Sequence, residues 1–426
     1  MHLLNKGMIT PMKKILFVLI TVFVVYNTSA QNIISAQDLI ISGNYTEAAG
    51  MLNNIILNDS SNAELYRKLA YCYSASEQYN KAIEVLLRGI ELKPDDSRFT
   101  LMLGDNYMSL EMYKEAKEMY LEYQEQNLNN IDGQLKLAKV YIALKEWTAG
   151  EAILNKLVGD GCNIPVCYEL LAKCQESLED NNNAVVSYYN CVRLNPNSIK
   201  NVINLCNLLF RMEKPKSAQS AAESNMQYHP QSSELWRIKA EALFKQEVYD
   251  MAVNSYKLAL MYGDTSITLY RNMGICLYAV GRPDSAFKYL NIAFNKKCDD
   301  YITSLYLGKV LQEFNNTEEA DYYLKKVEAI QTDSYVVESF VTLAVVYQKK
   351  KDYKKSIEYF SRALEFAPDR KSILFRIAAA YDEAFIDKSD ALKYYARYTG
   401  DSVNTDPKLY EYAVKRINEI NSGKHN

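Results

Sequence analysis

A small residue recurs every 34 positions along most of this chain. Alanine or glycine stands at nine positions with this constant spacing: Ala48, Ala82, Ala116, Gly150, Ala184, Ala218, Ala252, Ala286 and Ala320. The spacing then loosens, to Ser356 after 36 residues and Ala391 after a further 35. Self-similarity over this length is typical of repeat proteins, in which each repeat buries its apolar face against its neighbours. One repeat array therefore accounts for a chain of 426 residues without several separate domains.

Each repeat contains two amphipathic helical patterns. In the first, between residues 64 and 75, the i, i+3, i+4, i+7 spacing of one helix face is occupied by Tyr66, Leu69, Ala70 and Tyr73. In the second, between residues 79 and 92, one face contains Ala82, Ile83, Leu86, Leu87 and Ile90. Small residues are needed where two helices cross closely, so we expect the recurring alanine or glycine at that contact.

The order of residues within a repeat is distinctive. One repeat runs through Tyr66, Leu69-Ala70, Tyr73, Ala82, Leu86 and Pro94. Parts of the same order return as Leu103-Gly104 with Tyr107 and Ala116, and as Leu343-Ala344 with Tyr347 and Pro368. This order resembles the tetratricopeptide repeat (TPR) family, whose 34-residue pattern has a bulky residue, Leu-Gly or Leu-Ala, Tyr, Ala, an aromatic residue and Pro.

The resemblance covers nearly the whole chain and implies an all-α fold. We expect a right-handed superhelical solenoid of about eleven helical hairpins followed by a capping helix. The expected repeats are 31–62, 63–96, 97–130, 131–164, 165–198, 199–232, 233–266, 267–300, 301–334, 337–370 and 371–405. Residues 406–426 are expected to form the capping helix and a tail, because the last repeat would otherwise expose its apolar end.

The first 30 residues read as an export signal. Lys13 and Lys14 precede an apolar core at residues 15–26, and Thr28 and Ala30 are small residues suited to cleavage before Gln31. The signal reads better from Met12 than from Met1. An uncleaved anchor is the alternative, but twelve apolar residues fall short of the ~20 that span a membrane. The signal resembles those of exported Bacteroidetes proteins, and we expect a periplasmic chain, soluble or peripherally attached, with no stable membrane span after cleavage.

Residues suited to catalysis are scarce. The three histidines are His2, His229 and His425, and His229 precedes Pro230 in a turn between repeats. Glycine-rich phosphate loops, HExxH and CxxC spacings do not occur in the sequence. We therefore expect no enzyme activity, no cofactor and no metal site.

Seven of the eight cysteines, all except Cys298, fall into two groups. Cys72, Cys174 and Cys276 share one position in the repeat, and Cys191 and Cys206 also stand where small residues are expected, so these five read as small hydrophobic residues. Cys162 and Cys167 flank the turn GCNIPVC and form the one candidate disulfide. Two free thiols remain the alternative, because a disulfide demands a defined geometry that Pro165 restricts.

Tyrosine is abundant, with 35 residues. Many stand at repeat positions meant for large aromatic residues, where we expect them to pack in the core: Tyr73, Tyr79, Tyr107, Tyr113, Tyr249, Tyr347 and Tyr353.

The TPR resemblance implies that the first helix of each hairpin lines a concave groove. Basic and acidic residues are balanced over the groove positions as a whole, which disfavours nucleic acid as a partner. Repeats 199–300 have a local excess of basic and aromatic residues, and we take these as the candidate partner-binding site: Asn207, Phe210, Arg211, Arg237, Glu241, Phe244, Lys245, Arg271 and Tyr278. Alternatively, Phe210 and Phe244 pack between neighbouring helices rather than face the groove.

The function that we expect is a non-enzymatic scaffold or adaptor of the cell envelope, which binds a segment of a protein or peptide partner in the concave groove. The alternative is a structural subunit of an outer-membrane assembly or secretion complex.

Overall fold

The computed structural model describes residues 32–328, 333–400 and 406–423. These residues form helices joined by short turns, and none of them lies in a β-strand. They belong to two compact units, here called the N-terminal unit (Met1–Pro196) and the C-terminal unit (Asn197–Asn426). The expected signal peptide, residues 1–30, lies outside the described residues.

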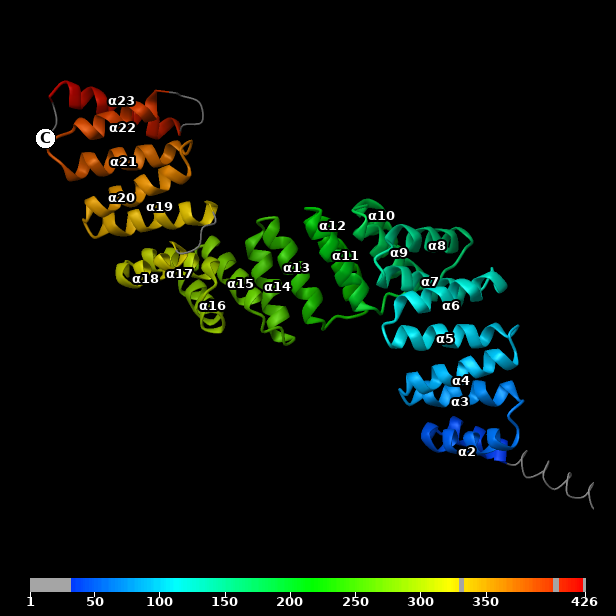
Figure 1. The fold of residues 1–426 in the computed structure, drawn as a ribbon. Helices are drawn as coiled ribbons and strands as arrows, with labels where there is room; N and C mark the ends of the chain where they lie inside the picture. Colours follow the sequence, from blue (N-terminus) through cyan, green and yellow to red (C-terminus); the bar gives the residue numbers. More distant parts are fainter. Residues whose placement is uncertain (1–31, 329–332, 401–405, 424–426) are drawn as a thin grey trace, which may run out of the picture. The chain divides into compact units, whose positions relative to one another are not determined.

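The N-terminal unit is a stack of helical hairpins (Figure 1). Residues 32–41 are helical. The helices that follow are α2 (Tyr45–Asn58), α3 (Ala63–Ala75), α4 (Tyr79–Leu92), α5 (Ser97–Ser109), α6 (Tyr113–Gln126), α7 (Ile131–Ala143), α8 (Trp147–Gly159), α9 (Pro165–Ser177) and α10 (Asn181–Leu194). Each helix from α2 onward packs against the next one in the chain, and α7 also packs against α9.

The C-terminal unit repeats this arrangement. Its helices are α11 (Ile199–Arg211), α12 (Pro215–Met226), α13 (Ser233–Lys245), α14 (Tyr249–Met261), α15 (Ile267–Ala279), α16 (Pro283–Lys296), α17 (Tyr301–Glu313), α18 (Thr317–Glu328), α19 (Asp333–Lys349), α20 (Tyr353–Phe366), α21 (Lys371–Ala384), α22 (Ser389–Thr399) and α23 (Pro407–Asn421). Consecutive helices pack together through to α23. The expected all-α class, built from successive packed helix pairs, is confirmed.

The recurring small residues lie at the contacts within these stacks. All of those named above, from Ala48 to Ala391, are buried. A second small position lies on the first helix of the hairpin, and Gly104 of α5 shows why it is small. A Cβ atom there would stand 2.6 Å from Cε1 of Tyr120, on the paired helix α6. Because interiors are close-packed, the two helices reach this separation only if one partner at the crossing is small.

Except at the α21–α22 turn, the turn within each hairpin of the described residues places one residue in the left-handed region of backbone space. These residues follow one another at 34 or 36 positions: Gly43, Glu77, Glu111, Lys145, Glu179, Glu213, Glu247, Gly281, Asn315 and Lys351. At the turn after α5, the N–H of Met112 donates to the carbonyl of Tyr107 at 2.9 Å. This hydrogen bond satisfies a carbonyl group at the C-terminal end of α5, as is typical where a left-handed residue, here Glu111, ends a helix. Most of these residues are not glycine, so the sequence did not reveal the pattern.

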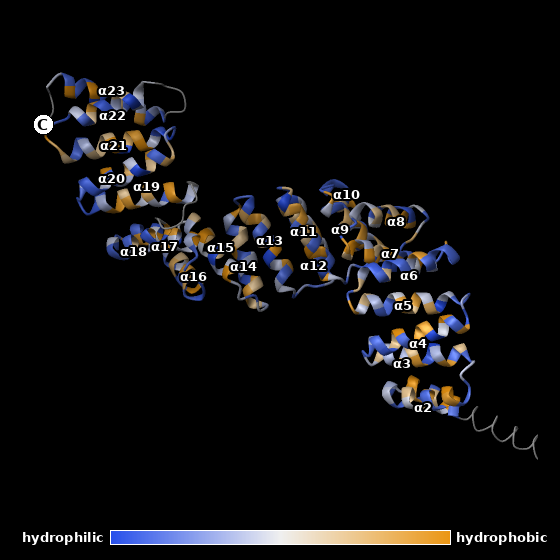
Figure 2. Cartoon of the chain, viewed as in Figure 1, coloured by the Kyte–Doolittle hydropathy of each residue, from blue (hydrophilic) through white to orange (hydrophobic). Residues whose placement is uncertain are grey.

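Two expectations about the core were wrong in part. Leu87, expected on the buried face of α4, is 46% exposed. Of the seven tyrosines expected in the core, Tyr347 is buried and the other six are half-buried. The completely buried tyrosines lie on second helices: Tyr120, Tyr256, Tyr395 and Tyr398. Figure 2 shows hydrophobic and hydrophilic residues on the same helices, which accords with the amphipathic patterns of the sequence.

Candidate partner-binding surface

The first helices of the C-terminal unit lie side by side. The chain of contacts runs from α11 to α13, α15, α17 and α19, and we call the surface that they form the first-helix face. The nine residues predicted for partner binding come from α11, α13 and α15. Asn207, Arg211 and Lys245 are exposed, whereas the remaining six are half-buried. The predicted residues therefore stand on three adjoining helices, and the three that are most accessible to solvent are polar.

Arg237 is held by two carboxylates. Its Nη1 lies 2.9 Å from Oε1 of Glu241, one turn further along α13. Its Nε lies 3.2 Å from Oδ2 of Asp264, in the turn before α15. Arg237 therefore links two successive repeats, and its charge is largely compensated within the protein.

Arg271 has the same role one repeat later. Its Nη1 lies 3.3 Å from both carboxylate oxygens of Asp300, the residue that precedes α17. Asp300 also accepts a hydrogen bond from the hydroxyl of Thr303. The sequence predicted a local excess of positive charge from the groove positions on the first helices. Asp264 and Asp300 lie in the turns before α15 and α17, outside those positions, and their negative charges reduce this excess.

The aromatic residues of this surface make contacts with neighbouring helices. The ring of Phe244 meets Tyr249 of α14 edge to face, with centroids 6.1 Å apart. Tyr278 meets Tyr306 of α17 in the same way at 5.9 Å. Burial, together with the nearby carboxylate of Glu313, raises the pKa of Tyr278 to about 12, so this phenol is neutral at physiological pH. Phe210 and Phe244 are both half-buried, a position between the two alternatives left open by the sequence.

The sequence reasoning missed a row of second-helix tyrosines whose hydroxyls reach first-helix acids. Tyr120 donates to Asp105 at 2.6 Å, and Tyr188 donates to Glu176 at 3.1 Å. The hydroxyl of Tyr256 is buried and has no hydrogen-bond partner among the described residues. Burial raises the pKa of Tyr256, and the negative charge of Glu241 adds to this effect. The sequence does contain a sign of this row, because Tyr120, Tyr188 and Tyr256 occupy the same repeat position in their second helices.

The first-helix face continues beyond the predicted residues. Nζ of Lys309 lies 5.4 Å from the ring centroid of Tyr306 and 3.1 Å from Oε2 of Glu338. Glu338 also pairs with Arg370 at 2.7 Å. The ion pairs Arg237–Asp264, Arg271–Asp300 and Lys309–Glu338 thus recur from repeat to repeat.

The N-terminal unit has a hollow of its own that the sequence did not indicate. Its volume is about 360 Å³, and its lining residues belong to α3, to the first position of α4 and to α5. They are Tyr71, Ser74, Ala75, Tyr79, Met102, Asp105, Asn106 and Ser109. The hydroxyl of Ser74 lies 2.7 Å from Oδ1 of Asn106, whose amide donates to the carbonyl of Met102. Asp105 is compensated by Nζ of Lys136 at 2.7 Å. The polar groups of this hollow are therefore largely engaged with one another.

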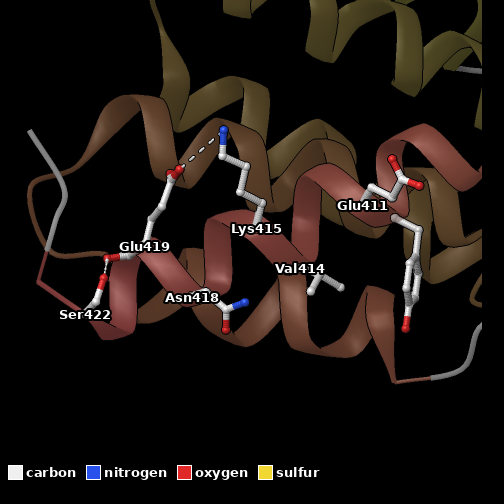
Figure 3. A pocket seen from close by; sticks show the side chains of 7 residues that line it. Glu411, Val414, Lys415, Asn418, Glu419 and Ser422 are labelled. Carbon is white, nitrogen blue, oxygen red and sulfur yellow. Dashed lines mark hydrogen bonds and ion pairs between the residues drawn. The ribbon is translucent and has the colours of Figure 1, made fainter.

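A further depression lies on α23 (Figure 3). Its lining comes from this one helix: Tyr410, Glu411, Val414, Lys415, Asn418, Glu419 and Ser422. Lys415 and Glu419 pair with each other at 3.8 Å. A wall made by one helix does not enclose a ligand, so we assign no site here.

The cysteines of the repeat positions behave as expected. Cys72, Cys174 and Cys276 are completely buried, as are Cys191 and Cys206. Burial raises the pKa of the Cys72 and Cys174 thiols to about 11 and that of Cys276 to about 12. The interpretation of these residues as small hydrophobic residues is confirmed. Cys162 and Cys167 lie next to each other, with 2.8 Å between their sulfur atoms.

Within residues 32–328, 333–400 and 406–423, no three His, Cys, Asp or Glu side chains gather closely enough to hold a metal ion. In the same ranges, no helix combines the length and apolar character needed to cross a bilayer.

These observations define a helical-repeat protein whose first helices adjoin one another in the C-terminal unit. Family profiles described as tetratricopeptide repeat match residues 39–105, 98–130, 166–198 and 337–370. These matches show that the chain contains tetratricopeptide repeats in these ranges, which agrees with its architecture of packed helical hairpins. Proteins of this family generally mediate protein–protein interactions.

Similar proteins include long chains of diverse kinds. Human Protein O-mannosyl-transferase TMTC3 is 22% identical over 323 residues, which cover 73% of this chain and 32% of that protein. Rat DnaJ homolog subfamily C member 3 is 30% identical over 116 residues, or 26% of this chain and 23% of that protein. The chain thus spans about a third or less of these relatives. Among solved structures, a chain of the APC/C hetero-tetramer Cut9–Hcn1 is similar, with 15% sequence identity and a TM-score of 0.45. The alignment covers 94% of this chain and 92% of that chain.

Proposed function

We propose that the chain is a non-enzymatic, protein-binding scaffold that holds a segment of a protein partner on the first-helix face of the C-terminal unit. One observation carries the proposal: the half-buried rings of Phe210, Phe244 and Tyr278 lie on three adjoining helices, two of which also present the exposed polar side chains of Asn207, Arg211 and Lys245. Aromatic side chains flanked by polar groups are typical of the centre of a protein interface. This proposal adds the groove and its position to the general role of the family.

The charges of this face favour a partner segment with apolar and acidic residues. Arg237 and Arg271 are compensated by Asp264 and Asp300 and hold the helices in register. Arg211 and Lys245, at the ends of α11 and α13, are cations of the predicted site that are exposed to solvent. An acidic side chain of the partner would gain attraction near these two residues while its apolar neighbours cover the aromatic rings.

The scaffold is proposed as non-catalytic because of the groups gathered on this face. The nine predicted residues supply one amide, three aromatic rings, three guanidinium groups, one carboxylate and one amine, and the guanidinium groups of Arg237 and Arg271 are bound to carboxylates. Among these nine described residues, no nucleophile is hydrogen-bonded to a general base. The relative named as a mannosyl-transferase aligns with this chain over 32% of its length, so its activity is not transferred to this protein.

We propose the cell envelope as the site of action, on the basis of the signal-like segment from Met12 to Ala30. The test is the N-terminal sequence of the full gene product isolated from fractionated bacterial host cells. A mature chain that begins at Gln31 and is recovered with the periplasm supports export, whereas an intact N-terminus in the cytosol contradicts it.

Site-specific photocrosslinking tests the proposed surface. A photoreactive amino acid at Asn207 or at Lys245 is expected to trap the partner, because both side chains are exposed on the first-helix face. The matched control is Lys257, which is exposed on α14, the second helix of the same hairpin. Equal crosslinking from Lys257 would contradict the groove and favour the structural subunit of a larger assembly, which would use several faces.

A charge-reversal pair tests the chemistry of the partner. The variant with Arg211→Glu and Lys245→Glu is expected to lose the crosslinked partner at least tenfold, while the melting temperature stays close to that of the wild type. The control variant carries Lys216→Glu and Lys257→Glu, the same change of charge on exposed second-helix positions. Retention of the partner by the first variant would show that an acidic segment is not what binds here.

A further inference from the structure

The junction between α8 and α9 brings two thiols into contact. Cys162 lies in the turn after α8, and Cys167 lies in the first turn of α9. Their sulfur atoms are 2.8 Å apart. Cys162 is 7% exposed and Cys167 is fully buried, so both sulfurs are largely shielded from solvent. Such a pair of adjacent, enclosed thiols differs from the isolated cysteines at the repeat positions.

The backbone already holds both residues in place. The N–H of Cys162 donates to the carbonyl of Leu157, and that of Cys167 donates to the carbonyl of Ile164, each at 3.0 Å. Gly161 takes the left-handed conformation that turns the chain back, with φ of +89°. Pro165 occupies the first position of α9, where its fixed φ suits the helix. Bond formation between the sulfurs therefore requires small side-chain movements rather than a rearranged turn.

We propose that Cys162 and Cys167 form an intramolecular disulfide that clips the α8–α9 turn when the chain meets a disulfide oxidant, such as oxidised glutathione or a protein disulfide. One thiolate attacks the S–S bond of the oxidant, which gives a mixed disulfide and releases one reduced thiol. The second thiolate then attacks the mixed disulfide, forms the Cys162–Cys167 bond and releases the second thiol. The two cysteines lose two electrons and two protons, and the oxidant becomes two thiols.

The surroundings of the pair determine when this exchange takes place. Burial, together with the neighbouring Cys162 thiol, raises the pKa of Cys167 to about 12, so its thiolate is scarce at neutral pH. The thiolate is the reactive form, and access to the sulfur is needed as well. The disulfide therefore forms while the turn is open during folding, and the folded protein then protects it from reductants. This makes the pair a structural clip of the N-terminal unit, independent of the binding function proposed above.

Cys191 is the competing thiol. It lies on α10, and its sulfur donates a hydrogen bond to the carbonyl of Pro165 at 3.3 Å. The direct contact between Cys162 and Cys167 favours their pairing over a bond that involves Cys191.

Peptide mapping of the full chain tests the pairing. The protein is refolded with reduced and oxidised glutathione, alkylated in denaturant without reduction, and digested with trypsin. The peptide LVGDGCNIPVCYELLAK contains Cys162 and Cys167 and no other cysteine. It is expected to lack two hydrogens and to carry no alkyl group until a reductant is added. The peptide CQESLEDNNNAVVSYYNCVR, with Cys174 and Cys191, is the internal control and is expected to be alkylated at both residues. Full alkylation of the first peptide, or a crosslink between the two, would overturn the proposal.

Reduction kinetics and variants test the shielding and the clip. Dithiothreitol is expected to open the disulfide at least tenfold more slowly in the folded protein than in urea; equal rates would contradict the shielding. The urea midpoint of the oxidised wild type is expected to fall on reduction, whereas that of Cys162→Ser is expected not to respond. Cys191→Ser, the control, is expected to respond like the wild type. A Cys162→Ser variant that responds fully would show that another pair is oxidised.

Discussion

The carboxylate of Asp382 accepts hydrogen bonds from Nε and Nη2 of Arg416, at 2.7 and 2.9 Å. Asp382 lies on α21 and Arg416 on α23, so this pair joins the last helix to the body of the C-terminal unit. Lys388 adds a second cation 3.3 Å from Asp382. Ala413 is the one fully buried residue of α23, and Tyr410 and Ile417 pack beside it, so the ionic contact adds to a small apolar contact in holding this helix.

We predict that Arg416→Met releases α23. The change leaves the buried carboxylate of Asp382 with Lys388 as its remaining cation, and we expect a loss of about 2 kcal/mol in the free energy of unfolding of this helix, below the range for a fully buried pair. Hydrogen exchange of the backbone amides of α23 measures the effect. Lys415→Met, on the same helix at an exposed position, is the control and should leave exchange unchanged. Similar exchange in both variants would contradict the role of the pair.

The same contact predicts a dependence on pH. Hydrogen bonds from Arg416, followed by its charge and that of Lys388, hold the pKa of Asp382 below its usual 3.8. Because the folded value is lower than the unfolded one, the contact stabilises the protein above the unfolded pKa and is lost as the pH falls through the folded pKa. The difference in urea midpoint between the wild type and Asp382→Asn is therefore expected to be largest near pH 7 and to shrink below about pH 4. A constant difference would show that Asp382 is not the titrating group.

The left-handed turn residues predict a stabilising substitution. Glu111 has φ of +57°, which a residue with a Cβ atom adopts at a cost. Glu111→Gly is expected to raise the free energy of unfolding by about 0.5–1 kcal/mol, the cost of the left-handed conformation less the entropy lost by glycine. Glu118→Gly, at an exposed position within α6, is the matched control and should lower it by roughly 0.5–1 kcal/mol. Urea denaturation measures both, and the same sign for the two variants would refute the argument.

The close crossing of α5 and α6 predicts that a larger residue at Gly104 destabilises the protein. Gly104→Ala puts a methyl group against the ring of Tyr120, which is 2% exposed and has little room to move. We expect a loss of roughly 1–3 kcal/mol, as for other overpacked cores. In the double variant with Tyr120→Leu, the smaller side chain should accept the methyl group, so that the combined loss is less than the sum of the single losses. Additive losses in a double-mutant cycle would mean that the two residues do not compete for the same space.

The repeat architecture could be predicted because its signals are local and periodic. Ala82 and Ala116 mark the same place in successive hairpins, and their burial is confirmed. The error at Leu87 has a local cause as well, because an apolar residue at the edge of a helix face is assigned to the core by spacing alone.

The details of the candidate surface could not be predicted in the same way. Arg237 and Arg271 looked like cations available to a partner, whereas the structure pairs them with Asp264 and Asp300. Those acids lie in turns 27 and 29 residues further along the chain. Helical spacing relates residues three or four positions apart, so it contains no information about contacts at this distance.

The amino-acid sequence alone was thus sufficient for the helical hairpins, their number and the small residues at their contacts, since each depends on a pattern within one repeat. The stacking of the helices decided which charges are compensated, which tyrosine hydroxyls reach a carboxylate and which two cysteines meet. The physical reason is that these interactions join side chains that come within a few ångströms of each other only after the hairpins have packed, as Asp382 and Arg416 do across 34 residues of chain.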